Sequence, residues 1–112
     1  MTQESAREAV VAWTTLPPET DATVFARVLV DERLAACVTC CGSVLSVYRW
    51  QGDVEQGDEQ LVMIKTTRPR VDALRARVID LHPYDTPEFI VVPVVDGAPD
   101  YLHWVSESTR SA

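Results

Sequence analysis

The sequence predicts an α+β protein with the ferredoxin-like order βαββαβ, in which the second and third strands form an extended hairpin and a C-terminal helix follows the last strand. Four apolar or β-branched segments are typical of strands, and two segments with apolar residues at helical spacing separate the first strand from the second and the third from the fourth. The second and third strand segments follow each other as in a hairpin. A length of 112 residues suits one domain over residues 1–112.

The first strand and the first helix are expected near the start of the chain. Glu8–Thr15 is a short apolar run that Pro17-Pro18 ends. Thr20 is expected to cap the helix, with Asp21 in its first turn, where a negative charge suits the helix dipole. The apolar stripe of this helix consists of Val24, Phe25, Val28 and Leu29.

A long hairpin is expected in the middle of the chain. Ala35–Trp50 is rich in valine, cysteine and tyrosine and is interpreted as a strand that bends near Gly42. Gln51–Asp58 is polar and is interpreted as a turn region, and Glu59–Thr67 as the returning strand.

The second half of the pattern repeats the first. Pro69 suits the first turn of a second helix, which must end near Pro83. Glu88–Val95 is the expected fourth strand, and Pro99 lies near the start of a last short helix. The second helix has its apolar positions at Val71, Leu74, Val78 and Leu81.

Two strand segments carry more apolar residues than one covered face requires. Leu61–Ile64 and Phe89–Val92 are continuously apolar, although a half-exposed antiparallel strand should alternate. Two helices cover one face of such a sheet, and leaving the other wet would cost about 25 cal/mol per Å². We therefore expect a second copy of the chain to cover it.

Composition excludes several classes of partner. The net charge of −7 comes from 17 acidic and 10 basic residues, whereas proteins that bind nucleic acid or anionic membranes usually carry the opposite bias. No apolar run approaches the ~20 residues that span a bilayer. Met1–Ala9 has no apolar stretch of signal-peptide length, so a cytoplasmic location is expected.

The three cysteines, Cys37, Cys40 and Cys41, are expected to be reduced thiols, because their number is odd and they lie within five positions. Side chains three apart on a strand point to opposite faces, so Cys37 and Cys40 cannot share an ion there. Cys37 is predicted to be a buried structural residue. A soft-metal or redox role stays open for Cys40 and Cys41.

His82 is expected at the end of the second helix, before Pro83. Its ring could bond the last carbonyl groups of the helix. Alternatively, a neutral imidazole suits Cu(II) or Zn(II), and His82 would then be a metal ligand at a subunit interface, with its symmetry mates, Cys40 or Glu88 as further ligands.

Five residues form a candidate ligand pocket. Tyr48 and Trp50 project from the same strand face, and Lys65 is an amine in an otherwise apolar strand, which indicates a carboxylate partner or a bound anion. Glu88 is the expected partner of Lys65. These residues, with Tyr84, make either an interface ion pair framed by aromatic rings or a small-ligand pocket between subunits.

Five motifs occur in a fixed order along the chain. The sequence resembles the CutA divalent-cation-tolerance family in these motifs, from about Ala9 to Ser108. They are Leu34-Ala35-Ala36-Cys37-Val38, Val47-Tyr48-Arg49-Trp50 with Gly52, Lys65-Thr66-Thr67, His82-Pro83-Tyr84-Asp85-Thr86-Pro87-Glu88 and Tyr101-Leu102-His103-Trp104.

The resemblance implies a ferredoxin-like subunit in a homotrimer, as in the PII-type signalling proteins, and a role in tolerance to divalent metals, especially copper. Copper-linked bacterial members carry a cysteine where this chain has Thr14 and a histidine where it has Leu81; only His82 of that set is present. Copper prefers imidazole and thiolate donors, so these departures remove two of them.

Three classes of function follow. The first is a homotrimeric protein of divalent-metal tolerance that binds copper, another divalent cation or a small ligand. The second is a PII-like sensor with a small anionic ligand at Lys65, or an interaction scaffold. The third, a cysteine-dependent enzyme, is not favoured, because no phosphate-binding loop, His-Glu-x-x-His or Gly-x-Ser-x-Gly motif is present.

Overall fold

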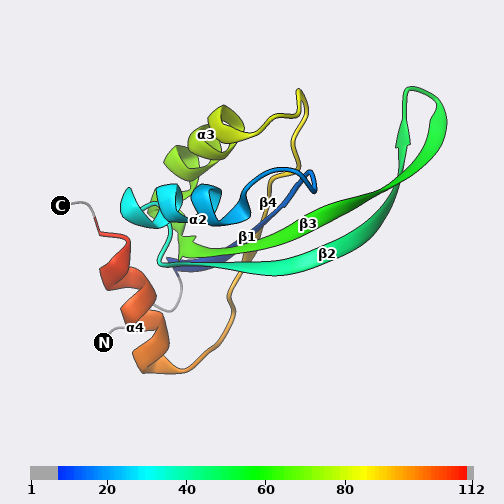
Figure 1. Cartoon of the computed structure of the whole chain (residues 1–112). Coiled ribbons are helices and arrows are strands. Elements are labelled where there is room, and N and C mark those ends of the chain that lie inside the picture. Colours follow the sequence, from blue (N-terminus) through cyan, green and yellow to red (C-terminus); the bar gives the residue numbers. More distant parts are fainter. Residues whose placement is uncertain (1–7, 111–112) are drawn as a thin grey trace.

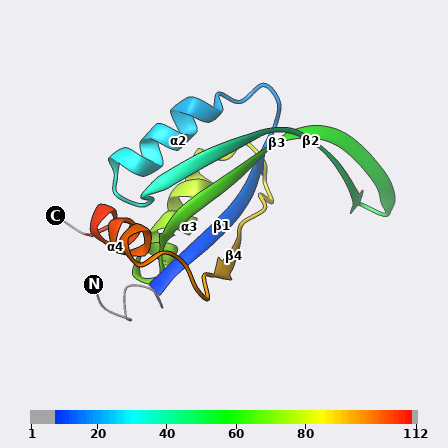
Figure 2. The ribbon, with the colours of Figure 1, turned by 90° about the horizontal axis from the view of Figure 1, so that it is seen from below.

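A computed structural model describes residues 8–110 of the chain. Two helices, α2 (Ala22–Asp31) and α3 (Val71–Leu81), lie on one face of a four-stranded sheet (Figure 1). A third helix, α4 (Pro99–Ser108), lies on the other side of the sheet, at one end (Figures 1 and 2). No helix within residues 8–110 has the length and apolar character needed to cross a membrane.

The sheet is antiparallel with the order β2-β3-β1-β4, which is the ferredoxin-like topology that the sequence predicts. Its strands are β1 (Ala9–Leu16), β2 (Cys37–Trp50), β3 (Asp53–Thr67) and β4 (Ile90–Pro93). The expected fourth strand is therefore longer than the observed one. The even-numbered residues of β1 point towards α2 and α3 and are buried.

The core lies between this face of the sheet and the two helices. Residues four apart on α2 and three or four apart on α3 turn one side of each helix towards the sheet. The buried apolar side chains that pack together in this core are Ala12, Leu16, Phe25, Leu29, Leu34, Ala35, Val62, Ile64, Leu74 and Val78.

Local signals explain how the helices begin and how they are joined. Asp21, not Thr20, caps α2: its carboxylate accepts from the backbone N–H groups of Thr23 and Val24 at 3.0 and 3.1 Å. Pro69 lies in a 3-10 turn, Arg68–Arg70, immediately before α3.

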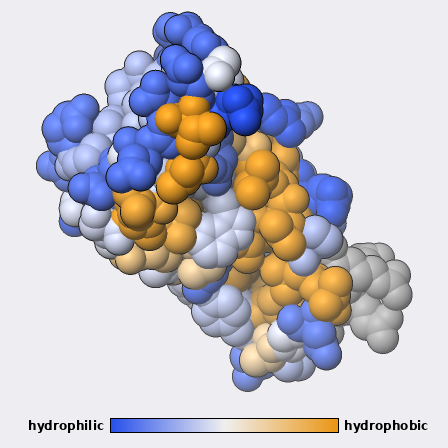
Figure 3. All heavy atoms as spheres, turned by 90° about the vertical axis from the view of Figure 1, so that its right-hand side faces the viewer, coloured by the Kyte–Doolittle hydropathy of each residue, from blue (hydrophilic) through white to orange (hydrophobic). Residues whose placement is uncertain are grey.

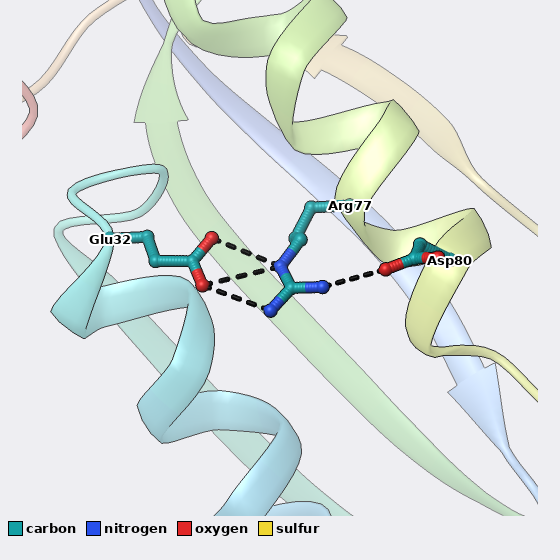
Figure 4. Close-up of polar contacts among 3 residues, drawn as sticks. All are labelled: Glu32, Arg77 and Asp80. Carbon is teal, nitrogen blue, oxygen red and sulfur yellow. Dashed lines mark hydrogen bonds and ion pairs between the residues drawn. The ribbon is translucent and has the colours of Figure 1, made fainter.

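An exposed ion-pair group links the end of α2 to α3. The Arg77 guanidinium donates to both carboxylate oxygens of Glu32, with Nε–Oε1 and Nη2–Oε2 distances of 3.0 Å (Figure 4). Its Nη1 donates to Asp80 at 2.7 Å. This two-oxygen geometry fixes the orientation of the two helices more than a single contact would.

The β2-β3 hairpin projects well beyond the rest of the molecule (Figure 1). With the hairpin included, the molecule extends over 48 × 25 × 22 Å along its principal axes. The predicted turn over Gln51–Asp58 was wrong in its length, because β3 already begins at Asp53 and only Gln51 and Gly52 form the turn. Polar residues continue the strand here because both of its faces meet solvent. The hairpin therefore has two parts. In the stem, within the sheet, Cys37–Cys40 pair with Val62–Lys65, and in the arm, beyond it, Ser43–Trp50 pair with Asp53–Gln60.

A bulge separates the stem from the arm, as the expected bend near Gly42 implies. The pairing shifts by one residue between Cys40 and Ser43, so that two residues of β2 lie opposite one of β3. Gly42 has a φ angle of 89°, a conformation that glycine adopts without the clash of a Cβ atom.

Candidate functional site

A cavity of about 650 Å³ lies between the hairpin and the segment that follows α3. This volume is in the range of small-molecule binding sites. Four of the five predicted pocket residues, Tyr48, Trp50, Tyr84 and Glu88, line it, and Lys65 does not. Its full lining is Thr15, Ser46, Val47, Tyr48, Trp50, Glu59, Pro83, Tyr84, Asp85, Thr86 and Glu88.

The bulge places the two aromatic residues of β2. Before it, odd-numbered β2 residues share a face with odd-numbered β3 residues, as in the pair Cys37–Lys65. After it, even-numbered β2 residues take that place, as in the pair Tyr48–Glu55. Tyr48 and Trp50 consequently project from the face to which Glu59 belongs, and both rings are about half exposed.

The second wall is the segment 82–88, which His82 anchors to the sheet. The buried ring accepts a hydrogen bond at Nδ1 from the backbone N–H of Tyr84 at 3.2 Å. Its Nε2 lies 2.6 Å from the carbonyl oxygen of Thr15, so Nε2 carries the proton and donates it. Both ring nitrogens are thereby engaged within the chain.

Two further contacts hold this wall. The hydroxyl of Thr14, which is fully buried, donates to the carbonyl oxygen of Glu88 at 2.7 Å. The hydroxyl of Tyr84 donates to Glu59 on β3 at 3.3 Å and so joins the two walls. Burial, followed by the charge of Glu59, raises the pKa of Tyr84 above its ordinary value.

Lys65 lies at a different place, where α4 meets the sheet. Its Nζ is 5.4 Å from the centre of the Tyr101 ring. Interaction with the Tyr101 side chain raises the pKa of Lys65, against a smaller opposing effect of burial. A separate cavity of about 200 Å³ lies here, lined by Lys65 and Tyr101 among others. The structure thus gives Lys65 an aromatic neighbour in place of the expected Glu88.

The three cysteines are unpaired thiols. Cys37 is half-buried, not buried as predicted, because it lies on the face of the sheet that α2 and α3 do not cover. Cys40 and Cys41 are exposed at the bulge. Within residues 8–110, no three His, Cys, Asp or Glu side chains are grouped closely enough to hold a metal ion.

Sequence reasoning missed two acidic residues of the cavity, Glu59 and Asp85. Asp85 directly follows Tyr84, which was a predicted pocket residue, so the sequence motif could have indicated Asp85 as well. Glu59 was expected at the start of the returning strand, and only the one-residue shift at the bulge reveals which β2 side chains share its face.

Comparison with known proteins identifies the family. The model of the CutA1 divalent ion tolerance protein family matches residues 10–108, which is nearly the whole chain. The chain belongs to the CutA1 family. The resemblance stated from its motifs is confirmed.

Individual CutA relatives agree in sequence and fold. The divalent-cation tolerance protein CutA of Thermus thermophilus is 44% identical over 95 residues, which cover 85% of this chain and 92% of that protein. Mouse protein CutA is 45% identical over 100 residues, but the match spans only 56% of the mouse protein. The crystal structure of CutA from Xylella fastidiosa has a TM-score of 0.88 at 42% identity, with 92% of this chain and 99% of that chain covered.

Proposed function

We propose that the protein serves divalent-metal tolerance as a homotrimer that binds a small ligand, and that it does not catalyse a reaction. The observation that carries this proposal is the cavity between the hairpin and segment 82–88. Its walls come from distant parts of the chain and are held in place by buried hydrogen bonds from Thr14 and His82. A preformed concave site of this kind is typical of ligand-binding proteins.

The trimer is supported by apolar surface that a single chain leaves uncovered. Trp13 and Met63 pair with each other on the sheet face opposite α2 and α3, and Ile90 is 54% exposed beside them. On the arm, Leu45 and Val54 are more than 60% exposed. Figure 3 shows such apolar patches between polar ones on one side of the molecule. Exposed apolar side chains that are grouped in this way indicate contact with another chain.

Copper contact is proposed at the exposed thiols of Cys40 and Cys41 and not at His82. The His82 ring has no lone pair left for a metal, because Nδ1 accepts from Tyr84 and Nε2 donates to Thr15. Soft thiolates are ligands that Cu(I) prefers. Free thiols also suit the reducing cytoplasm, which we propose as the location of the protein.

Two alternatives have less support. A PII-like sensor with an anion at Lys65 would have to use the smaller cavity beside Tyr101, since Lys65 does not line the larger one. An enzyme with a Cys–His pair would need a histidine next to a thiol. Among the described residues, His82 bonds to Thr15 and Tyr84, and His103 lies 3.9 Å from Glu107.

Two measurements test the proposal. Sedimentation at micromolar concentration should show three chains of 12.5 kDa in one particle, and a folded single chain would contradict it. Calorimetry with Cu(II), and with Cu(I) under reducing conditions, should give the same affinity for wild type and His82→Gln. If wild type binds copper and His82→Gln does not, the imidazole of His82 is a ligand and the proposed copper contact is wrong.

A further inference from the structure

The charges on the walls of the large cavity are all of one sign. Three carboxylate residues, Glu59, Asp85 and Glu88, line it, and none of the described lining residues is a lysine, an arginine or a histidine. Lys65, the cation expected here, lies beside Tyr101. The charged groups of these walls would therefore repel an anion, whereas the net charge of −7 attracts cations over longer distances.

The same walls present aromatic rings. In the single chain, Tyr48, Trp50 and Tyr84 are 47%, 50% and 40% exposed, so the rest of that chain leaves part of each of these aromatic residues uncovered. The faces of such rings carry partial negative charge and attract ammonium groups, most strongly for tryptophan. The hydroxyl of Tyr84 donates to Glu59, which holds the Tyr84 ring beside that carboxylate.

The arrangement suits an organic cation better than a bare metal ion. A metal ion needs several donor atoms converging on one point, and the carboxylates of the described chain are not grouped in that way. A cavity of about 650 Å³ is also much larger than one ion requires. An alkylated ammonium group spreads its charge over the attached carbon groups, so dispersed carboxylates and aromatic rings can contact it together.

We propose that this cavity binds a small organic ammonium compound, held by the rings of Tyr48, Trp50 and Tyr84 and by the carboxylates of Glu59, Asp85 and Glu88. This inference rests on the proposed ligand-binding function and adds the chemical class of the ligand. The methylene or methyl groups of the ligand would contact Trp50, while its positive charge would be balanced by the carboxylates.

The experiment is calorimetric titration of the full-length protein with a matched pair of probes. Choline and 3,3-dimethylbutan-1-ol have the same shape, but only choline is charged. We expect choline to bind with one site per chain, and the neutral alcohol to bind about tenfold or more weakly. Citrate and ATP serve as anionic probes, and MgCl2 as a metal without an organic part.

Variants then locate the bound choline. Trp50→Ala should weaken it about tenfold, and Glu88→Gln about threefold to tenfold. Trp104→Ala is the matched control, because Trp104 lies on α4 and is 45% exposed, close to the 50% of Trp50. It should leave the affinity unchanged.

The outcomes separate this inference from the proposed function. If citrate or ATP binds in a Trp50-dependent manner and choline does not, the cavity is a ligand site but the cationic class is wrong. Equal binding of choline and its neutral analogue would also overturn the cationic class. If no probe binds, or if Trp50→Ala changes no affinity, both the inference and the proposed ligand site fail.

Discussion

His82 should stabilise the fold, and His82→Ala should measure by how much. His82 is only 8% exposed, and the substitution removes both hydrogen bonds of its ring. These are the bond from Nε2 to the carbonyl oxygen of Thr15 at 2.6 Å and the bond from the backbone N–H of Tyr84 to Nδ1 at 3.2 Å. It also removes the contact between the His82 and Tyr84 rings, whose centres are 4.9 Å apart.

The size of the effect follows from these contacts. Each hydrogen bond contributes about 0.5–1.5 kcal/mol, and the ring pair about 0.5–1.5 kcal/mol. The loss should therefore be about 1.5–4.5 kcal/mol. His82→Gln should lose less, because its amide N–H can still donate to the carbonyl of Thr15 while the bond from Tyr84 is lost.

Denaturant unfolding, followed by circular dichroism at one fixed protein concentration, measures this loss. The concentration must be held constant because assembly contributes to the apparent stability. His103→Ala is the control, since His103 is exposed on α4 and should change stability by no more than about 0.5 kcal/mol. If His82→Ala unfolds at the same denaturant concentration as wild type, the ring does not anchor segment 82–88.

Four further predictions concern other contacts. Thr66→Val should lower the free energy of unfolding by about 1–3 kcal/mol, because the fully buried hydroxyl of Thr66 donates to the carbonyl oxygen of Leu34 at 2.7 Å. Thr66→Ser should recover most of this loss. An unchanged denaturant midpoint for the valine variant would contradict the role of this hydrogen bond. Gly42→Ala should lower the free energy of unfolding by about 1–2 kcal/mol through the φ angle of 89° alone, since a Cβ atom there would meet no atom within 4 Å. Gly57→Ala should lower it less, because a Cβ atom there also meets none and the φ angle is not positive. Equal losses for the two variants would be evidence against the conformational explanation. The raised pKa of Tyr84 means that the unfolded chain loses this proton first, so stability should fall as pH rises from the ordinary tyrosine value of about 10 to the higher folded value; Tyr84→Phe should show a smaller fall in unfolding midpoint between about pH 9 and pH 11, and an identical fall would refute the shift. Tyr101→Phe should lower the pKa of Lys65, measured by NMR titration of the Lys65 ε-methylene signals, whereas Tyr48→Phe should not.

Much of the fold was predictable because it depends on local patterns. The apolar stripe of α2 and the prolines around α3 placed both helices, and Gly42 marked the bend in β2. The strand from Asp53 to Asp58 was missed for a physical reason. A strand exposed on both faces has no apolar alternation, so its only sequence signal is its polarity, which turns share.

The candidate site was predictable only in part, since it depends on how distant segments meet. Tyr48 and Trp50 could be placed on one face from their spacing alone, and that spacing holds in the structure. The neighbour of Lys65 could not be found in this way, because α4 brings Tyr101 to it from more than thirty positions along the chain. Likewise, nothing in the local sequence shows that His82 would bond to Thr15 on β1.

The bulge between Cys40 and Ser43 makes the length of the hairpin stem as important as its residues. Removing one residue there would turn every side chain of the β2 arm to the opposite side, and Tyr48 and Trp50 would leave the cavity together although neither had been substituted. Adding one residue to each strand near the tip, opposite one another, would keep the pairing below it intact. Natural variants of this protein should therefore tolerate changes in arm length at the tip and exclude single-residue insertions or deletions at the stem.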